Sequence, residues 1–164
     1  NVYSVKGQGT TFELYFKLSE FSPDKVDEVQ ESNFKPGHER ILLVDDDQMI
    51  ASLAERILSE NGYQVTALID SREALELFSS QPDQFDMLVT DQTMPELTGK
   101  DLIQEVLTIK PDLPTILCTG NSSKLDRSKI SHLDIKAVLM KPIPQTELLV
   151  NVRRVLDEAA GKIY

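Results

Sequence analysis

The sequence predicts an α/β protein with a doubly wound, five-stranded parallel sheet, preceded by a β-hairpin and a linker. Two observations lead to this fold class. From Glu39 to Ile163, short apolar runs alternate with longer segments of helical period, which is typical of βαβ units. The runs are also continuously apolar, as expected for strands of a parallel sheet that are buried on both faces.

The individual elements follow from this alternation. We expect strands over residues 41–44, 64–68, 87–90, 115–118 and 137–140. The amphipathic segments between and after them predict helices over 49–60, 71–79, 99–109, 125–132 and 145–158, of which the fourth is the weakest. Ser71 is predicted to cap the second helix, and Asn61-Gly62 to end the first in a left-handed turn. Right-handed crossovers then place helices on both faces of the sheet.

The N-terminal residues have a different texture. The runs 2–4 and 11–18 flank Gly7-Gln8-Gly9, and the second run alternates apolar and polar side chains, which predicts a β-hairpin. Residues 19–38 are polar and contain two prolines, which indicates a linker with a short helical turn around 23–31. The expected organisation is therefore a hairpin over 1–18, a linker over 19–38 and the α/β domain over 39–164.

Charge and cysteine content exclude several classes of protein. Seventeen Lys and Arg against 27 Asp and Glu give a net charge of −10, which argues against nucleic acid as a partner. The single Cys excludes an internal disulfide framework. No apolar run reaches the roughly 20 residues of a membrane span. We expect a cytoplasmic protein, with membrane attachment only through upstream parts of a longer parent chain.

Polar side chains of functional type follow four of the predicted strands. They are Asp45, Asp46 and Asp47 after the first strand, Asp91 after the third, Thr119 after the fourth and Lys141 after the fifth. In open parallel sheets, ligands bind outside the carboxyl ends of the strands, so these side chains are expected to converge. Converging carboxylates repel one another unless a cation lies among them or some are protonated.

The residue types at these strand ends indicate the chemistry. Because there is no Cys or His cluster, a hard ion such as Mg²⁺ is the expected cation. A lysine and a hydroxyl opposite the carboxylates complete a site that fits a phosphoryl group. A carboxylate in line with that group can act as the nucleophile.

Four motifs in this order resemble the receiver domain of two-component response regulators: ILLVDDD, LVTDQTMPELTG, ILCTG and VLMKP. The resemblance extends from Glu39 to about Ala160. It implies a flavodoxin-like fold with the strand order 2-1-3-4-5. It also implies a site in which Asp91 accepts the phosphoryl group, Thr119 is the switch hydroxyl and Lys141 binds phosphate. The implied ligands of Mg²⁺, or of Mn²⁺ in its place, are Asp45, Asp46, Asp91 and the backbone carbonyl of Thr93.

The N-terminal segment VYSVKGQGTTFELYF is similar to the closing strands of the ATPase domain of sensor histidine kinases. This similarity implies that residues 1–18 are a remnant of such a domain in a hybrid sensor kinase. The fragment would catalyse its own phosphorylation and dephosphorylation, whereas the parent chain would be a protein-histidine kinase. The implied partners are the phosphohistidine domain of a histidine kinase and a histidine phosphotransfer protein. A homodimer is also compatible with the sequence.

Two other functions are each compatible with part of the sequence. A haloacid dehalogenase-like Mg²⁺ phosphohydrolase fits the DxD spacing of Asp45 and Asp47, but Met49 stands where that family has Thr or Val. A degenerate receiver that acts only as a binding module disagrees with the complete acid set. Some residues also have simpler structural interpretations. These are Asp47 as a helix cap, Cys118 as a small buried hydrophobe, and Arg153 with Arg154 as a solvated helix face.

Overall fold

The computed structural model describes residues 1–15, 36–120 and 133–161, which belong to two units, one within residues 1–33 and one from residue 34 onwards. The first unit is an antiparallel hairpin of β1 (Val2–Val5) and β2 (Gly9–Phe12). Gly7 and Gly9 have positive φ in its turn region, as glycine permits. The predicted hairpin is therefore present, but its second strand ends at Phe12. Residues 16–18 lie outside the described part.

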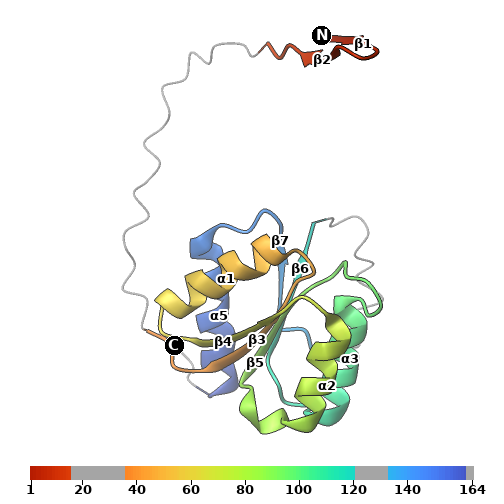
Figure 1. The fold of residues 1–164 in the computed structure, drawn as a ribbon. Coiled ribbons are helices and arrows are strands. Elements are labelled where there is room, and N and C mark those ends of the chain that lie inside the picture. The colour runs from red at the N-terminus through yellow and green to blue at the C-terminus, as the bar shows by residue number, and fades with distance from the viewer. Residues whose placement is uncertain (16–35, 121–132, 162–164) are drawn as a thin grey trace. The chain divides into compact units, whose positions relative to one another are not determined.

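The second unit contains a five-stranded parallel sheet (Figure 1). Its strands are β3 (Arg40–Val44), β4 (Gln64–Leu68), β5 (Met87–Asp91), β6 (Thr115–Thr119) and β7 (Ala137–Met140). They lie in the order β4-β3-β5-β6-β7, and every neighbouring pair is parallel. Counted along the chain from β3, this is the order 2-1-3-4-5, which confirms the predicted fold class.

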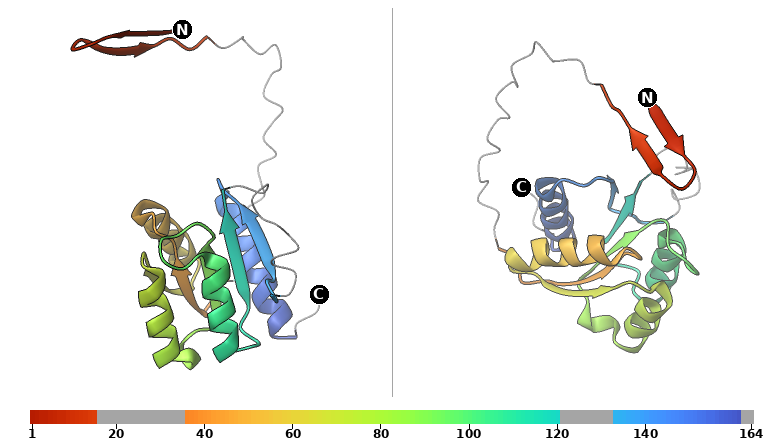
Figure 2. Two further views of the ribbon diagram at one scale, coloured as in Figure 1. Left: turned by 90° about the vertical axis from the view of Figure 1, so that its right-hand side faces the viewer. Right: turned by 45° about the horizontal axis from the view of Figure 1, so that its top comes forward.

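Helices cover both faces of the sheet (Figures 1 and 2). The helices are α1 (Gln48–Glu60), α2 (Ser71–Ser80), α3 (Gly99–Ile109) and α5 (Gln145–Ala159), with a short 3₁₀ turn η1 (Pro82–Gln84) after α2. The predicted helix over 125–132 and the predicted turn over 23–31 lie outside the described residues. In the part of the chain that is described, no helix combines the length and hydrophobicity needed to cross a bilayer.

Alternating side chains along the central strands supply two apolar layers. Ile41 and Leu43 of β3 pack in the layer under α1 and α5, whereas Leu42 and Val44 pack in the layer under α2 and α3. This is the period of two that a strand imposes on its side chains. The sheet is thereby held between two helical layers, which positions the carboxyl ends of its strands.

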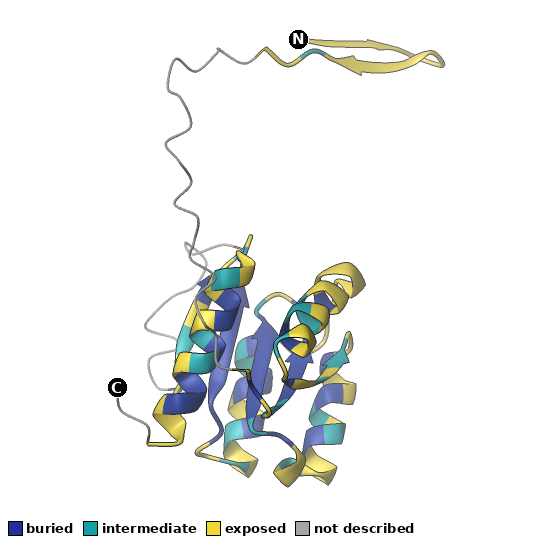
Figure 3. Cartoon of the chain, turned by 90° about the vertical axis from the view of Figure 1, so that its left-hand side faces the viewer, coloured by how far each residue is buried: buried dark blue, intermediate teal, exposed yellow. Residues whose placement is uncertain are grey.

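Burial on both faces, expected for all five strands, holds only for the three in the middle. Every residue of β5 and β6 is buried, and so are all residues of β3 except Arg40 (Figure 3). In β4 no residue is fully buried, and in β7 only Leu139 is. The prediction is wrong for β4 and β7 because both are edge strands with a neighbour on one side only.

In three of the described helices, a side chain caps the N-terminus. The Asp47 carboxylate accepts hydrogen bonds from two N–H groups of α1, and the Thr98 hydroxyl accepts one from α3. The cap of α2 is Asp70, whose carboxylate accepts from the N–H groups of Arg72 and Glu73. The prediction that Ser71 caps this helix is therefore wrong. At the end of α1, Gly62 has a φ of 94°, as the predicted left-handed turn requires.

An ion-pair cluster joins α5 to the first residues of the sheet. The Arg153 guanidinium donates to both Glu39 carboxylate oxygens, at 2.8 and 3.1 Å, and its Nη2 lies 2.8 Å from Asp157. The Arg153 side chain is only 17% exposed, so the interpretation of this residue as part of a solvated face is wrong. Burial is the largest single influence and opposes ionisation of Glu39, but the Arg153 hydrogen bond, backbone hydrogen bonds and the Arg153 charge together outweigh it and lower the pKa of Glu39 to about 2.

Replacing Glu39 by Gln should destabilise the α/β unit in a pH-dependent way. The pKa of Glu39 lies below its ordinary value of 4.5, so its contribution is complete above that pH and is lost as the pH falls toward 2. We expect Glu39→Gln to lower the free energy of unfolding by about 2 to 3 kcal/mol at pH 7. Urea denaturation at pH 7 and near pH 2.5 should show this difference shrinking.

Glu60→Gln is the matched control for this measurement. Glu60 pairs with Arg56 on the exposed surface of α1, where ion pairs contribute little. An equal loss of stability in both variants would contradict a special role for the buried pair.

Candidate functional site

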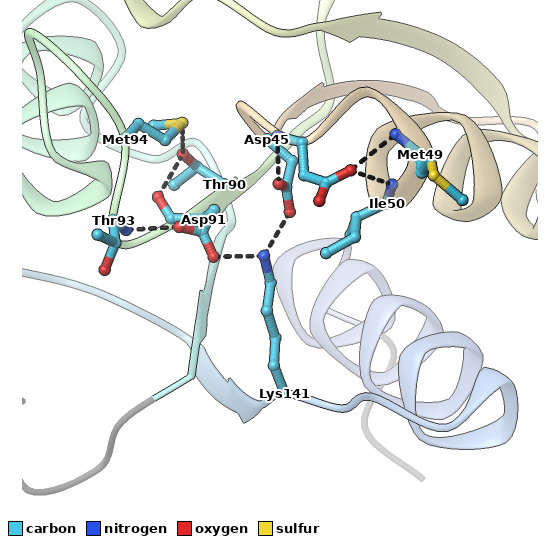
Figure 4. A network of polar contacts seen from close by, with 9 residues as sticks. Asp45, Met49, Ile50, Thr90, Asp91, Thr93, Met94 and Lys141 are labelled. Atoms are coloured by element: carbon cyan, nitrogen blue, oxygen red, sulfur yellow. Dashed lines mark hydrogen bonds and ion pairs between the residues drawn. The ribbon is translucent and has the colours of Figure 1, made fainter. Parts of the chain in front are cut away.

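Two carboxylates and one ammonium meet at the carboxyl ends of the strands (Figure 4). Asp45 directly follows β3, Asp91 is the last residue of β5, and Lys141 directly follows β7. The Lys141 Nζ lies 2.6 Å from Asp45 Oδ2 and 2.6 Å from Asp91 Oδ1. The predicted convergence of these three residues is therefore present.

Burial sets the electrostatics of this triad. The side chains of Asp45 and Asp91 are each 6% exposed, and that of Lys141 is 21% exposed. Burial raises the pKa of Asp45, against the opposing effect of Lys141. For Lys141, burial works against the charged form, but hydrogen bonds to both carboxylates prevail and raise its pKa. The ammonium is thus stably charged and shared by two acids.

Main-chain groups hold the loop that follows Asp91. The Thr93 N–H donates to Asp91 Oδ2, and the Thr90 hydroxyl donates to the Asp91 carbonyl at 3.1 Å. The Gly99 N–H donates to the Gln92 carbonyl at 3.1 Å. The first bond orients the Asp91 carboxylate, and the other two fix the main chain on either side of it.

Gly99 is a residue of this site that the sequence analysis missed. A Cβ atom at Gly99 would lie 2.1 Å from the Asp91 backbone oxygen, a contact that backbone atoms cannot relieve cheaply. Glycine is therefore required where α3 begins against the strand end. The sequence did contain a signal for this role, because a glycine directly after Thr98 at the start of a helix can indicate a close approach of another backbone segment.

The other residues that the sequence predicts for the site differ from one another in position and burial. Thr119 is the last residue of β6 and is buried, and its carbonyl accepts the Lys141 N–H at 2.8 Å. The following peptide bond, Lys141–Pro142, is cis. Asp46 is exposed, and Asp47 caps α1 as its structural interpretation predicted. Residues 121–132 after the Thr119 strand lie outside the described part.

The donor set at the triad fits a magnesium ion better than a metal that needs a complete protein cage. Within the described ranges, no group of three or more His, Cys, Asp or Glu side chains could hold a metal ion. The site instead offers the buried carboxylates of Asp45 and Asp91, and the next residue along the chain from Asp45, Asp46, is exposed. Mg²⁺ binds through one or two carboxylates and keeps several waters, so this set of oxygen donors suits it.

An apolar cavity of about 210 Å³ lies beside the triad. Besides the three charged residues, it is lined mainly by aliphatic side chains of α1, α5 and the central strands, among them Leu53, Ile57, Val89 and Leu148. Cys118 also lines it and is buried, and burial raises the pKa of its thiol to about 12. Cys118 is therefore a protonated, small apolar residue, as predicted.

Comparisons with known proteins agree with the predicted family. The model of the response regulator receiver domain matches residues 41–153. The response regulator MprA of Mycolicibacterium vanbaalenii is 38% identical over 130 residues, which are 75% of this chain and 54% of that protein. MprA of Mycobacterium tuberculosis is 38% identical over 119 residues, 71% of this chain and 50% of its own length. The chain thus spans about half the length of these curated relatives.

Solved structures show the same similarity. A CheY-like receiver domain protein from Methanospirillum hungatei aligns with a TM-score of 0.71 and 27% identity, covering 77% of this chain and all of that one. The non-phosphorylated HemR receiver domain from Leptospira biflexa aligns with a TM-score of 0.66 and 29% identity, covering 72% of this chain and 94% of that one.

Removing the shared ammonium should expose the repulsion between the two acids. We expect Lys141→Met to lower the free energy of unfolding by about 3 kcal/mol at pH 7, because two buried carboxylates lose their common cation. The loss should be smaller at pH 5 than at pH 7, because burial raises the pKa of Asp45 and the lower pH favours its uncharged form. Urea denaturation at the two pH values measures both quantities.

Lys136→Met controls for the loss of a lysine as such. Lys136 pairs with Asp134, which is 65% exposed, so its removal should change stability by less than about 1 kcal/mol. A Lys141→Met effect that is the same at both pH values would contradict the coupling of the two carboxylates.

Proposed function

Because the chain belongs to the response regulator receiver domain family of two-component signalling, we propose that it takes a phosphoryl group from a phosphohistidine onto Asp91. The observation that carries this proposal is the environment of the Asp91 carboxylate. One of its oxygens faces the Lys141 ammonium at 2.6 Å, and the other accepts the Thr93 N–H. Both neighbours are donors that can also stabilise charge on a phosphoryl oxygen.

The proposed transfer is a single displacement at phosphorus. An Asp91 carboxylate oxygen forms a bond to phosphorus while the bond from phosphorus to the histidine nitrogen breaks. The electron pair stays on the imidazole nitrogen, which takes a proton from solvent. Hydrolysis reverses the modification: the oxygen of a water bonds to phosphorus, the bond to Asp91 breaks, and inorganic phosphate leaves with the Asp91 carboxylate restored.

The proposed ligands of Mg²⁺ are Asp45, Asp46, Asp91 and the Thr93 carbonyl, and Mn²⁺ is an alternative ion. Bound there, the ion would neutralise phosphoryl oxygens and lower the repulsion between phosphate and carboxylates. Lys141 would exchange one carboxylate contact for a phosphoryl oxygen. Thr119, at the end of the neighbouring strand, would donate its hydroxyl to another oxygen and so report phosphorylation to the loop after β6.

We also propose the place of this module in a phosphorelay. Receiver domains receive phosphoryl groups from histidine kinases. The GxGTTF turn and the antiparallel strands β1 and β2 support an origin of residues 1–18 in the ATPase domain of a hybrid kinase, with a linker over 19–38 and the receiver over 39–164. A histidine phosphotransfer protein is then the proposed acceptor, and the cytoplasm the proposed location.

Asp91→Asn should abolish labelling by a small phosphodonor such as acetyl phosphate and leave the fold intact. The variant loses the nucleophilic carboxylate, while the amide keeps nearly the same volume in the buried position. Intact-mass spectrometry in the presence of Mg²⁺ should show the added phosphoryl group in the wild type only, and circular dichroism should show equal folding.

Asp47→Asn is the control for this experiment. Asp47 lies in the same acidic run but serves as the cap of α1, a role that Asn fills as well. This variant should be labelled as the wild type is. Labelling that persists in Asp91→Asn would instead assign the acceptor to Asp45 or Asp46.

Asp46→Asn should weaken Mg²⁺ binding by about tenfold or more, because it removes one anionic oxygen from the proposed ligand set. The same change should stabilise the metal-free protein slightly, because it reduces repulsion among neighbouring carboxylates. Calorimetric titration with Mg²⁺ measures the affinity, and urea denaturation in a chelator measures the stability. An unchanged affinity would remove Asp46 from the ligand set.

A further inference from the structure

We infer that Ser71 is a positioning residue for the loop that follows Asp91. Its hydroxyl clamps residues 95–97 and thereby holds the main chain of Thr93 against the Asp91 carboxylate. The inference rests on the proposed function of Asp91 and concerns a residue on a different helix, α2, far from Asp91 in the sequence.

The Ser71 hydroxyl is committed to this loop. The hydroxyl donates a hydrogen bond to the Pro95 carbonyl at 3.0 Å, and its oxygen accepts one from the Leu97 N–H at 3.2 Å. Ser71 is 3% exposed, so water does not compete easily for these bonds. The hydroxyl is also not needed to cap α2, because the Asp70 carboxylate does that. The hydroxyl of this buried serine at a helix start thus donates one hydrogen bond and accepts another, and both join it to a different segment.

The two Ser71 hydrogen bonds hold a turn over residues 95–97 whose backbone conformation is unfavourable. The Leu97 N–H also donates to the Pro95 carbonyl at 2.8 Å, which makes a γ-turn centred on Glu96. Glu96 has a φ of 65° and is the only non-glycine residue of the described ranges with positive φ. This backbone conformation is strained for an L-residue with a side chain. An ion pair between Arg72 and the Glu96 carboxylate adds a second contact from α2.

The clamped turn is close enough to the site to control it. It lies between Thr93 and the start of α3, where the Gly99 N–H is bonded to the Gln92 carbonyl. The loop is therefore tied at both ends, and a relaxation at Glu96 has to be absorbed by the few residues between them. Thr93 is among these residues, and its N–H orients Asp91 while its carbonyl is a proposed metal ligand.

The test compares Ser71→Ala with Ser79→Ala. Ser79 lies on the same helix, and its hydroxyl donates only to the Leu75 carbonyl on the exposed surface. With both proteins free of metal, we expect the Leu97 amide hydrogen to exchange with solvent faster in Ser71→Ala than in the wild type. We also expect Mg²⁺ affinity to fall about three- to tenfold, somewhat less than for groups that contact metal ligands directly. Acetyl phosphate labelling at subsaturating Mg²⁺ should slow accordingly. Ser79→Ala should match the wild type in all three measurements.

Glu96→Gly in the Ser71→Ala background provides a rescue. Glycine adopts positive φ without steric cost, so the turn should no longer need the clamp, and Mg²⁺ affinity should recover. If Ser71 were purely structural, Ser71→Ala would lower the melting temperature and leave Mg²⁺ affinity unchanged, or an affinity lost in Ser71→Ala would not return with Glu96→Gly. Either result would overturn the inference.

The wild-type measurements separate this inference from the function on which it rests. If the wild type binds Mg²⁺ and is labelled, and Ser71→Ala does both equally well, only the role of Ser71 is refuted. If the wild type itself neither binds Mg²⁺ nor accepts phosphate, the proposed function fails and the role of Ser71 fails with it.

Discussion

Two carboxylates that are almost removed from water share one ammonium, and the remainder of the α/β unit is arranged around this requirement. An unpaired buried charge costs several kcal/mol, so the two buried acids Asp45 and Asp91 depend on the Lys141 ammonium that they share. One cation does not fully balance two acids. In the proposed function, the remaining negative charge would suit a divalent cation, and the shared lysine would then turn to an incoming phosphoryl group. A site with one carboxylate and one ammonium would have no excess negative charge to attract such a cation and no shared lysine.

The parallel sheet is what brings these three residues together. Asp45, Asp91 and Lys141 lie at the carboxyl ends of strands that all end at the same edge of the sheet, and Asp45 and Asp91 come from adjacent strands. Apolar layers on both faces fix the register of these strands. Local contacts then set the finer geometry, because Gly99 allows α3 to begin against the Asp91 carbonyl and the γ-turn at Glu96 is clamped from α2.

A second ion cluster near the start of the sheet has a different character. Arg153 binds Glu39 through two parallel hydrogen bonds and also contacts Asp157, so its guanidinium is committed to a fixed geometry. This cluster joins α5 to the residue before β3 and contributes stability. Lys141, at the carboxyl ends of the strands, holds its two carboxylates through a single point charge, which suits the exchange of contacts proposed for it.

The sequence by itself determined the fold class, the strand order through its family resemblance, and the convergence of Asp45, Asp91 and Lys141. Strand ends of a parallel sheet meet at one edge, so a residue's place after an apolar run is enough to locate it. Tertiary structure decided which strands are edges, which of two adjacent residues caps α2, and that Arg153 is largely covered and paired rather than solvated. These outcomes depend on neighbours that are distant in the sequence. The clamp from Ser71 to the loop after Asp91 joins residues about two elements apart, and no local pattern marks such a contact.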